Sequence, residues 1–189
     1  MDKPLYLFVG KSASGKTSTA NFLEKKHGLK QVDSYTTRPP RCDGETGHIF
    51  VNNEQFDNLG ELVAYTEYNG FRYGTTAEQL DKCDIYVVDV PGVKTLLERY
   101  KMDRKIIILY FSTTICTRII RMIDRGDSDA AIISRLLQDE KEDWSDELND
   151  IVWRHRAYYN SNVYLVDMYA DDDLTSVVTR VERYMEVYA

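Results

Sequence analysis

The stretch Gly10-Lys11-Ser12-Ala13-Ser14-Gly15-Lys16-Thr17 decides the fold of this chain. It matches the pattern G-x-x-x-x-G-K-[ST], in which glycines let the backbone turn tightly around an anion and point successive N–H groups at phosphate oxygens. An apolar run at residues 5–9 precedes it and is typical of a buried strand, and a helical pattern at residues 17–27 follows it. Because a helix N-terminus adds unpaired donors and a favourable dipole, the combination predicts a phosphate-binding loop, or P-loop.

Individual roles follow from the geometry expected of this loop. Lys16 is placed to reach the β- and γ-phosphates of a nucleotide, and the Thr17 hydroxyl is placed to ligate Mg²⁺. ATP and Mg²⁺ are therefore the expected cofactors. The residues predicted to bind the nucleotide are Gly10, Lys11, Ser12, Ala13, Ser14, Gly15, Lys16, Thr17 and Ser18. The competing interpretation is a glycine-rich turn that matches by chance, which average composition allows in ~1% of chains of this length.

Length and composition narrow the class of protein. With 189 residues, 43% of them hydrophobic, the chain is expected to form one domain or one core with small inserts. No apolar run approaches ~20 residues and the first strand starts almost at once, so we expect neither a membrane span nor a signal peptide. A net charge of −7 argues against general nucleic-acid binding. The wide spacing of Cys42, Cys83 and Cys116 favours reduced thiols in the cytoplasm, and the scattered histidines suggest no zinc site.

Strands and helices alternate along the chain, which predicts the α/β class with a three-layer P-loop NTPase core around a mainly parallel, doubly wound sheet. Further strands are expected at 31–32, 85–90, 104–111 and 163–166, and helices at 93–100, 113–125, 129–144 and up to 159. We expect a core at 1–37, 76–113 and 160–189, a small β-rich insert at 38–75, a helical lid at 114–145 and a helical extension of the core at 146–159.

Arginines gather at two places outside the loop. Arg121 and Arg125 lie four residues apart on one expected helix, where like charges repel unless an anion lies between them, and Arg135 lies on the next helix. A solvated face is the usual interpretation, but a closing lid would use these arginines to stabilise charge on a transferred phosphoryl group. Arg38 and Arg41, on a segment stiffened by two prolines, are placed to clamp a second phosphate bidentately with Tyr73. A second phosphate site predicts an acceptor that is itself phosphorylated.

Asp89 follows the expected strand at 85–88. A carboxylate at the C-terminal end of a strand beside a P-loop is placed to orient water bound to Mg²⁺. The alternative is an aspartate that caps the following helix.

In this order the motifs resemble the guanylate kinase family over nearly the whole chain. The matching stretches are the P-loop, Ser34 with Thr36-Thr37-Arg38-Pro39-Pro40-Arg41, Gly44-Glu45, Phe50-Val51, Tyr73-Gly74-Thr75-Thr76, Asp89 before Gly92-Val93-Lys94, Arg121 with Arg125-Gly126, and Arg135-Leu136. The resemblance implies phosphate contacts from Arg38, Arg41 and Tyr73 and a base contact from Ser34. It implies a catalytic set of Lys16, Arg121, Arg125 and Arg135, a substrate-binding set of Ser34, Arg38, Arg41, His48, Tyr73, Thr75 and Asp89, and a metal site of Thr17 and, through water, Asp89.

The chain departs from the family pattern at the expected base site. His48 stands where the family has a tyrosine, and Ala64 stands where it has a guanine-reading glutamate. Glu67 is the nearest carboxylate, but three residues along a strand place it on the opposite face. The second carboxylate that the family carries after the one matching Asp89 is missing from a shortened turn at 89–92, and residues 143–161 are longer than the usual connection.

The resemblance implies ATP-dependent phosphorylation of a nucleoside monophosphate, GMP or dGMP, by in-line transfer in a monomer or homodimer. Two alternatives stay open. A related kinase with another phosphorylated acceptor, such as a different nucleotide or a sugar phosphate, is favoured by Ala64. A catalytically silent interaction module is disfavoured, because Lys16 and the three lid arginines are all present.

Overall fold

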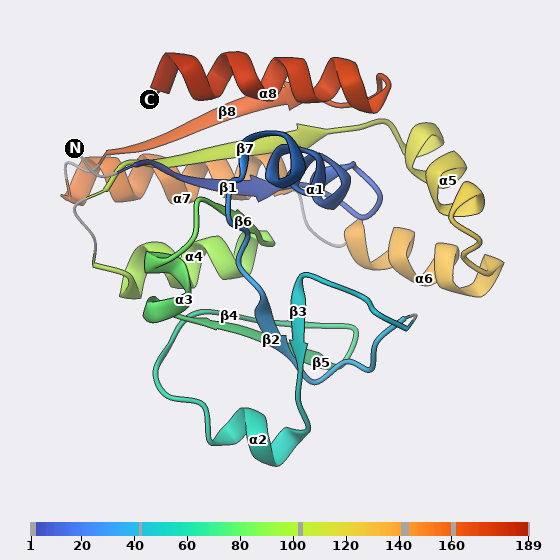
Figure 1. The fold of residues 1–189 in the computed structure, drawn as a ribbon, viewed down its shortest axis with the longest axis horizontal. Helices are drawn as coiled ribbons and strands as arrows, with labels where there is room; N and C mark the ends of the chain where they lie inside the picture. The colour runs from blue at the N-terminus through green and yellow to red at the C-terminus, as the bar shows by residue number, and fades with distance from the viewer. Residues whose placement is uncertain (1–2, 42, 102–103, 141–143, 160–161, 189) are drawn as a thin grey trace.

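A computed structural model of the chain describes residues 3–41, 43–101, 104–140, 144–159 and 162–188. Its central sheet has four parallel strands in the order β6-β1-β7-β8 (Figure 1). These strands are β1 (Leu5–Val9), β6 (Ile85–Val87), β7 (Ile106–Ser112) and β8 (Val163–Tyr169). The predicted parallel sheet is confirmed.

Helices cover both faces of this sheet, as near-continuous apolar strands require. In β1, Leu5 and Leu7 point into one core cluster, and Tyr6 and Phe8 point into another. The first cluster is closed by α4 (Val90–Arg99) and α7 (Trp144–Tyr159), and the second by α1 (Lys16–His27) and α8 (Leu174–Tyr188). The three-layer α/β core that the alternation of elements predicted is therefore confirmed.

A second sheet lies beneath the core in Figure 1, with strand order β3-β2-β5-β4. Its elements are β2 (Ser34–Thr36), β3 (His48–Phe50), α2 (Asn53–Asp57), β4 (Leu62–Tyr68) and β5 (Phe71–Thr76). β5 pairs antiparallel with both β2 and β4. The turn between β4 and β5 has positive φ at Asn69 (51°) and Gly70 (76°), as a tight hairpin requires. Because β2 belongs to this sheet, the sheet begins at Ser34 rather than at residue 38.

The segment expected to act as a lid folds as two helices, α5 (Ile115–Asp124) and α6 (Asp129–Asp139), which stand beside the core and above the second sheet (Figure 1). We call these two helices the lid hairpin after that expectation. Gly126, with φ of 84°, turns the chain between the two helices. Thr114 caps α5 and Ser128 caps α6 through side-chain oxygens that accept backbone N–H bonds.

Three local expectations were wrong. The strand at 31–32 is a single bridge between Gln31 and Ile85. The strand expected to reach residue 90 ends at Val87, and the following helix begins at Val90 rather than 93, because Asp89 caps it and Pro91 fits its first turn. The helix expected at 129–144 ends at Asp139. The short helix α3 (Ala77–Asp81) follows Thr76, its N-cap residue.

No helix among the described residues is long and apolar enough to cross a bilayer. Cys83 and Cys116 are free thiols, whereas Cys42 lies outside the described residues.

Candidate active site

The P-loop joins β1 to α1 with a backbone that only small residues accept. Gly10 has φ of 153°, and a Cβ there would lie 2.8 Å from the carbonyl oxygen of Phe111 on β7. Gly15, with φ of 97°, precedes the first turn of α1 and supplies no side-chain cap. The first N–H groups of α1 therefore lack a side-chain acceptor, which is the arrangement that binds an anion.

Lys16 lies across the mouth of this loop. Its Nζ donates to the carbonyl oxygens of Gly10 at 2.5 Å and Lys11 at 2.9 Å, and to Ser14 Oγ at 3.2 Å. Desolvation of Nζ lowers the pKa of Lys16 to about 8, with the charge of Asp139 opposing that shift. The side chain is therefore still mainly cationic at neutral pH, within reach of whatever the loop binds.

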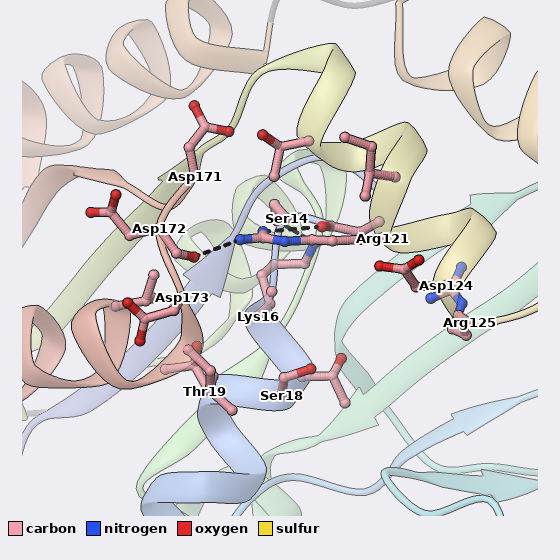
Figure 2. Close-up of a pocket in the computed structure, with 17 residues that line it drawn as sticks. Ser14, Lys16, Ser18, Thr19, Arg121, Asp124, Arg125, Asp171, Asp172 and Asp173 are labelled. Atoms are coloured by element: carbon pink, nitrogen blue, oxygen red, sulfur yellow. Dashed lines mark hydrogen bonds between the residues drawn. The ribbon is translucent and has the colours of Figure 1, made fainter.

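One cavity opens beside the P-loop on the α5 and α8 side. It encloses about 750 Å³ and is lined by residues 13–19 of the loop and α1, by α5, and by the turn at 171–173. Figure 2 shows Arg121 crossing this space from α5. Its guanidinium donates to the carbonyl oxygens of Ala13 at 3.4 Å, Ala170 at 2.8 Å and Asp172 at 2.9 Å. We call this space the first cavity.

A second cavity of about 230 Å³ lies between the P-loop and the second sheet. The predicted site residues that line it come from the loop, the second sheet, the β6–α4 junction and the lid. They are Gly10, Ser12, Ala13, Lys16, Thr17, Ser34, Arg41, His48, Tyr73, Asp89, Arg125 and Arg135. Lys16, Thr17 and Arg125 line both cavities. The phosphate loop is thus shared by two spaces.

Two predicted substrate contacts do not line the second cavity. Thr75 is fully buried and donates to the Tyr86 hydroxyl at 2.9 Å. Arg38 is 7% exposed and bonds Glu45 through two nitrogens, Nη1 at 3.1 Å and Nη2 at 2.7 Å. Burial acts to raise the pKa of Glu45, but bonds from Arg38 and from the Arg41 backbone outweigh it and hold that pKa at about 2. Glu45 therefore fixes Arg38, whereas Arg41, whose Nη1 lies 3.7 Å from Glu45 Oε1, also lines the second cavity.

Asp89 caps a helix and also lines the second cavity. Its Oδ1 accepts the Gly92 N–H at 2.9 Å and so caps α4, which is the alternative interpretation. The same carboxylate lines the second cavity, as does Thr17. Burial raises the pKa of Asp89, against the hydrogen bonds from Thr66 and Gly92.

The base end of the second cavity differs from what the family pattern led us to expect. Ala64 is fully buried in the apolar core against α4 and does not line the cavity. Thr66 and Tyr68, on the same face of β4, line the cavity instead. Ser34 Oγ and His48 Nδ1 lie 2.9 Å apart. Burial, followed by the charge of Arg38, lowers the pKa of His48. Glu67 is exposed and accepts the Tyr65 hydroxyl bond, so it stays outside the cavity.

Several residues that line the two cavities were not predicted from the sequence. Thr66, Tyr68, Tyr86 and Asp139 line the second cavity, and the 171–173 turn lines the first. The period-2 pattern of β4 would have placed Thr66 and Tyr68 on the face of Ala64. Asp139 follows Arg135 by four residues on one helix, a spacing that places the two on one side. The 171–173 turn carries no comparable signal.

A mainly parallel sheet with a P-loop shared by two cavities defines a P-loop NTPase fold. No protein-family profile matches the chain. It is 32% identical over 151 residues to the guanylate kinase of Thermosynechococcus vestitus, covering 73% of this chain and 78% of that relative. It is 30% identical over 145 residues to the guanylate kinase of Nitrosomonas europaea, covering 70% and 71%. The chain belongs to the guanylate kinase family.

Solved structures agree at the level of the fold. The guanylate kinase from Anaplasma phagocytophilum superposes with a TM-score of 0.55 at 17% identity, covering 98% of this chain and 85% of that one. A sugar kinase from Janibacter sp. HTCC2649 superposes with a TM-score of 0.50 at 12% identity, covering 98% and 95%. At these identities the likeness concerns the fold alone.

Proposed function

We propose that this protein transfers the γ-phosphoryl group of ATP to GMP or dGMP, as the names of its relatives indicate. The observation that carries the proposal is the P-loop shared by two cavities, one beside α5 and α8 and one facing the second sheet. A donor in the first cavity and an acceptor in the second would meet at Lys16 and Thr17. In-line transfer needs that meeting point, because positioning and charge stabilisation account for most of the catalysis.

The donor side is assigned to the first cavity. Backbone N–H groups of the loop and Lys16 would hold the β- and γ-phosphates, and Arg121 reaches the loop at Ala13 from the lid side. The Thr17 hydroxyl and the Asp89 carboxylate share the second cavity and are hard oxygen ligands of the kind that Mg²⁺ accepts together with water and phosphate oxygens. When bound, Mg²⁺ would neutralise charge on the transferred group.

The acceptor side is assigned to the second cavity. Arg41 and Tyr73 line it from the second sheet and would hold the phosphate of the monophosphate, while Arg125 and Arg135 line it from the lid. No general base is required, because the attacking atom is already a phosphate oxygen. Ser34, His48 and Thr66 form the polar wall left for the base.

We assign three moving parts: the parallel-sheet core, the second sheet as the monophosphate-binding insert, and the lid hairpin. Closing the insert and lid over the core would exclude water from the transfer. Cytoplasmic metabolism of purine nucleotides by a monomer or homodimer, without nucleic-acid or membrane partners, is the setting that we propose.

A second acceptor class stays open for one reason. Ala64 packs in the core, so β4 offers no carboxylate to the guanine edge, and a related kinase with another phosphorylated acceptor fits the same phosphate machinery.

A coupled ADP-release assay with ATP, Mg²⁺ and a panel of GMP, dGMP, IMP, AMP and pyrimidine monophosphates tests the proposal. We expect turnover with GMP or dGMP that stops when EDTA removes Mg²⁺. Activity restricted to acceptors other than purine monophosphates would support the second class. ADP release with no member of the panel and no sugar phosphate would favour the silent interaction module.

A further inference from the structure

Asp139, the last residue of α6, gathers donors from three separate parts of the molecule. It is fully buried. Its Oδ2 accepts the Ser12 backbone N–H at 2.8 Å and Arg118 Nη1 at 3.1 Å. Its Oδ1 accepts Ser12 Oγ at 3.2 Å and the Tyr68 hydroxyl at 3.3 Å. One carboxylate therefore ties the P-loop, α5 and β4 together at the C-terminal end of the lid.

This arrangement is electrostatically unfavourable for α6 taken alone. A carboxylate in the last turn of a helix lies at the negative end of the helix dipole. Its partner Arg118 is 1% exposed, and among the described residues the Arg118 Nε has no hydrogen-bond acceptor. Apolar residues in place of a buried ion pair are often as stable or more stable. Stability alone is therefore a poor explanation for the Arg118–Asp139 pair.

The pair closes the base of the lid hairpin. Arg118 lies one helical turn before Arg121 on α5, and Asp139 lies one turn after Arg135 on α6. Arg121 itself reaches Ala13 in the P-loop at 3.4 Å. A displacement of Arg118 or Asp139 would therefore also displace Arg121 and Arg135, each one helical turn away, which line the first and the second cavity respectively.

We propose that the Arg118–Asp139 pair is a clasp that fixes the base of the lid to Ser12 and thereby sets where Arg121, Arg125 and Arg135 stand relative to the phosphate loop. Asp139 is a positioning residue, because it acts through Ser12 and Arg118. This inference rests on the proposed phosphoryl transfer. A displacement of about 1 Å in positioned groups is enough to cost roughly 100-fold in rate.

The first variant is Asp139→Asn, which keeps the shape of the side chain and removes its charge. We expect kcat to fall roughly 100-fold while KM for both GMP and ATP stays within about threefold, the signature of groups misplaced only for the transition state. Hydrogen exchange at the Ser12 amide, measured without nucleotide, should become faster because its acceptor is weakened. Glu78→Gln is the matched control, since it breaks the exposed Lys82–Glu78 pair and should change neither quantity.

The second variant, Arg118→Met with Asp139→Ala, removes both charges and guards against simple misfolding. The clasp predicts a thermal melt close to that of the wild type and a kcat that stays low. Recovery of both melt and kcat in the double variant would reduce the pair to core filling and overturn the proposal. So would an unchanged kcat in Asp139→Asn, or a rise in KM alone, which would mean direct substrate binding.

The two proposals fail separately. If the wild type shows no turnover with any phosphorylated acceptor, the proposed function fails. In that case the Ser12 exchange rates still decide the clasp, with unchanged exchange in Asp139→Asn overturning it.

Discussion

The two cavities around the P-loop are built in different ways. The first combines one contiguous run, residues 13–19, with residues of α5, the 171–173 turn and α8. The second combines residues of the loop with residues scattered over β2, β3, β4, β5, the β6–α4 junction and the lid hairpin. A site built from a contiguous motif keeps its geometry through local backbone conformation, whereas a site built from many elements depends on how those elements pack. The acceptor side is therefore where this chain has room to differ from its relatives.

Lys16→Ala should give the largest effect, because Lys16 lines both cavities and would contact donor and acceptor alike under the proposed function. We expect kcat to fall roughly 100- to 1,000-fold, as when one preorganised charge donor is lost. Steady-state kinetics measure the loss, and a thermal melt like that of the wild type shows that the fold is kept. Retention of more than about a tenth of kcat, less than 1.4 kcal/mol of lost stabilisation, would contradict a shared phosphate centre.

Arg41→Ala should separate the two cavities. Arg41 lines the second cavity and not the first. Its loss should therefore weaken binding of the monophosphate by about 2–4 kcal/mol, seen as a higher KM for the monophosphate, and leave KM for ATP nearly unchanged. The comparison variant is Arg38→Ala, whose guanidinium is bound to Glu45. We expect Arg38→Ala also to raise KM for the monophosphate, because loss of the Arg38–Glu45 pair would loosen the segment that carries Arg41. Equal changes in both KM values for Arg41→Ala would show that the arginine does not define a separate acceptor site.

Base discrimination should be weaker than the family pattern implies, because Ala64 packs in the core. We expect kcat/KM for GMP to exceed that for IMP by less than ~100-fold, about 2.7 kcal/mol. Ala64→Glu would bury a carboxylate among apolar side chains, so it should lower Tm without sharpening the preference. Thr66→Val, which removes a hydroxyl from the cavity wall, should lower kcat/KM for GMP by about tenfold. A wild-type preference for GMP above 100-fold would show that another group reads the 2-amino edge.

The smallest expected effect concerns the acid stability of the insert. Against the opposing effect of burial, hydrogen bonds from Arg38 and the Arg41 backbone lower the pKa of Glu45 from its ordinary value of 4.5 to about 2 in the fold. A lowered folded pKa means that Glu45 adds stability above pH about 4.5 and that this contribution is lost as the pH falls towards 2. Glu45→Gln should cost roughly 1–3 kcal/mol at neutral pH, the worth of a hydrogen bond to a charged group. Urea unfolding of the wild type and Glu45→Gln at pH 7 and pH 3 measures this difference in the free energy of unfolding. An equal difference at both pH values would show that ionisation of Glu45 does not stabilise the fold.

Much of the site could be predicted because phosphate recognition is local. The P-loop, the strand before it and the helix after it are determined within about twenty residues by glycine conformation, apolar periodicity and the helix N-terminus. The cap that Asp89 provides for the following helix is equally local, and the structure contains it. Their roles in binding stay predictions.

The faces presented by individual residues were harder to predict. Arg38 and Arg41 look equivalent in sequence and both pair with Glu45, but Arg38 pairs at 2.7 Å and is buried, whereas Arg41 pairs at 3.7 Å and lines the second cavity. Thr75 follows Tyr73 by two residues on β5, a spacing that places both on one face of the strand, yet Thr75 is fully buried and donates to Tyr86 while Tyr73 lines the second cavity. Which residue of a face reaches the cavity depends on the elements that pack over that face.

By itself, the sequence determined the α/β core, the phosphate loop and the likeness to guanylate kinases, because each of these rests on short-range backbone preferences and on residue types in order. Only the tertiary structure decided that Ala64 packs in the core, that Thr66 takes its place at the cavity, and that Asp139 meets Ser12 across 127 residues of chain. Contacts between residues that distant are set by the packing of whole elements, and a buried carboxylate finds its donors only once those elements have come together.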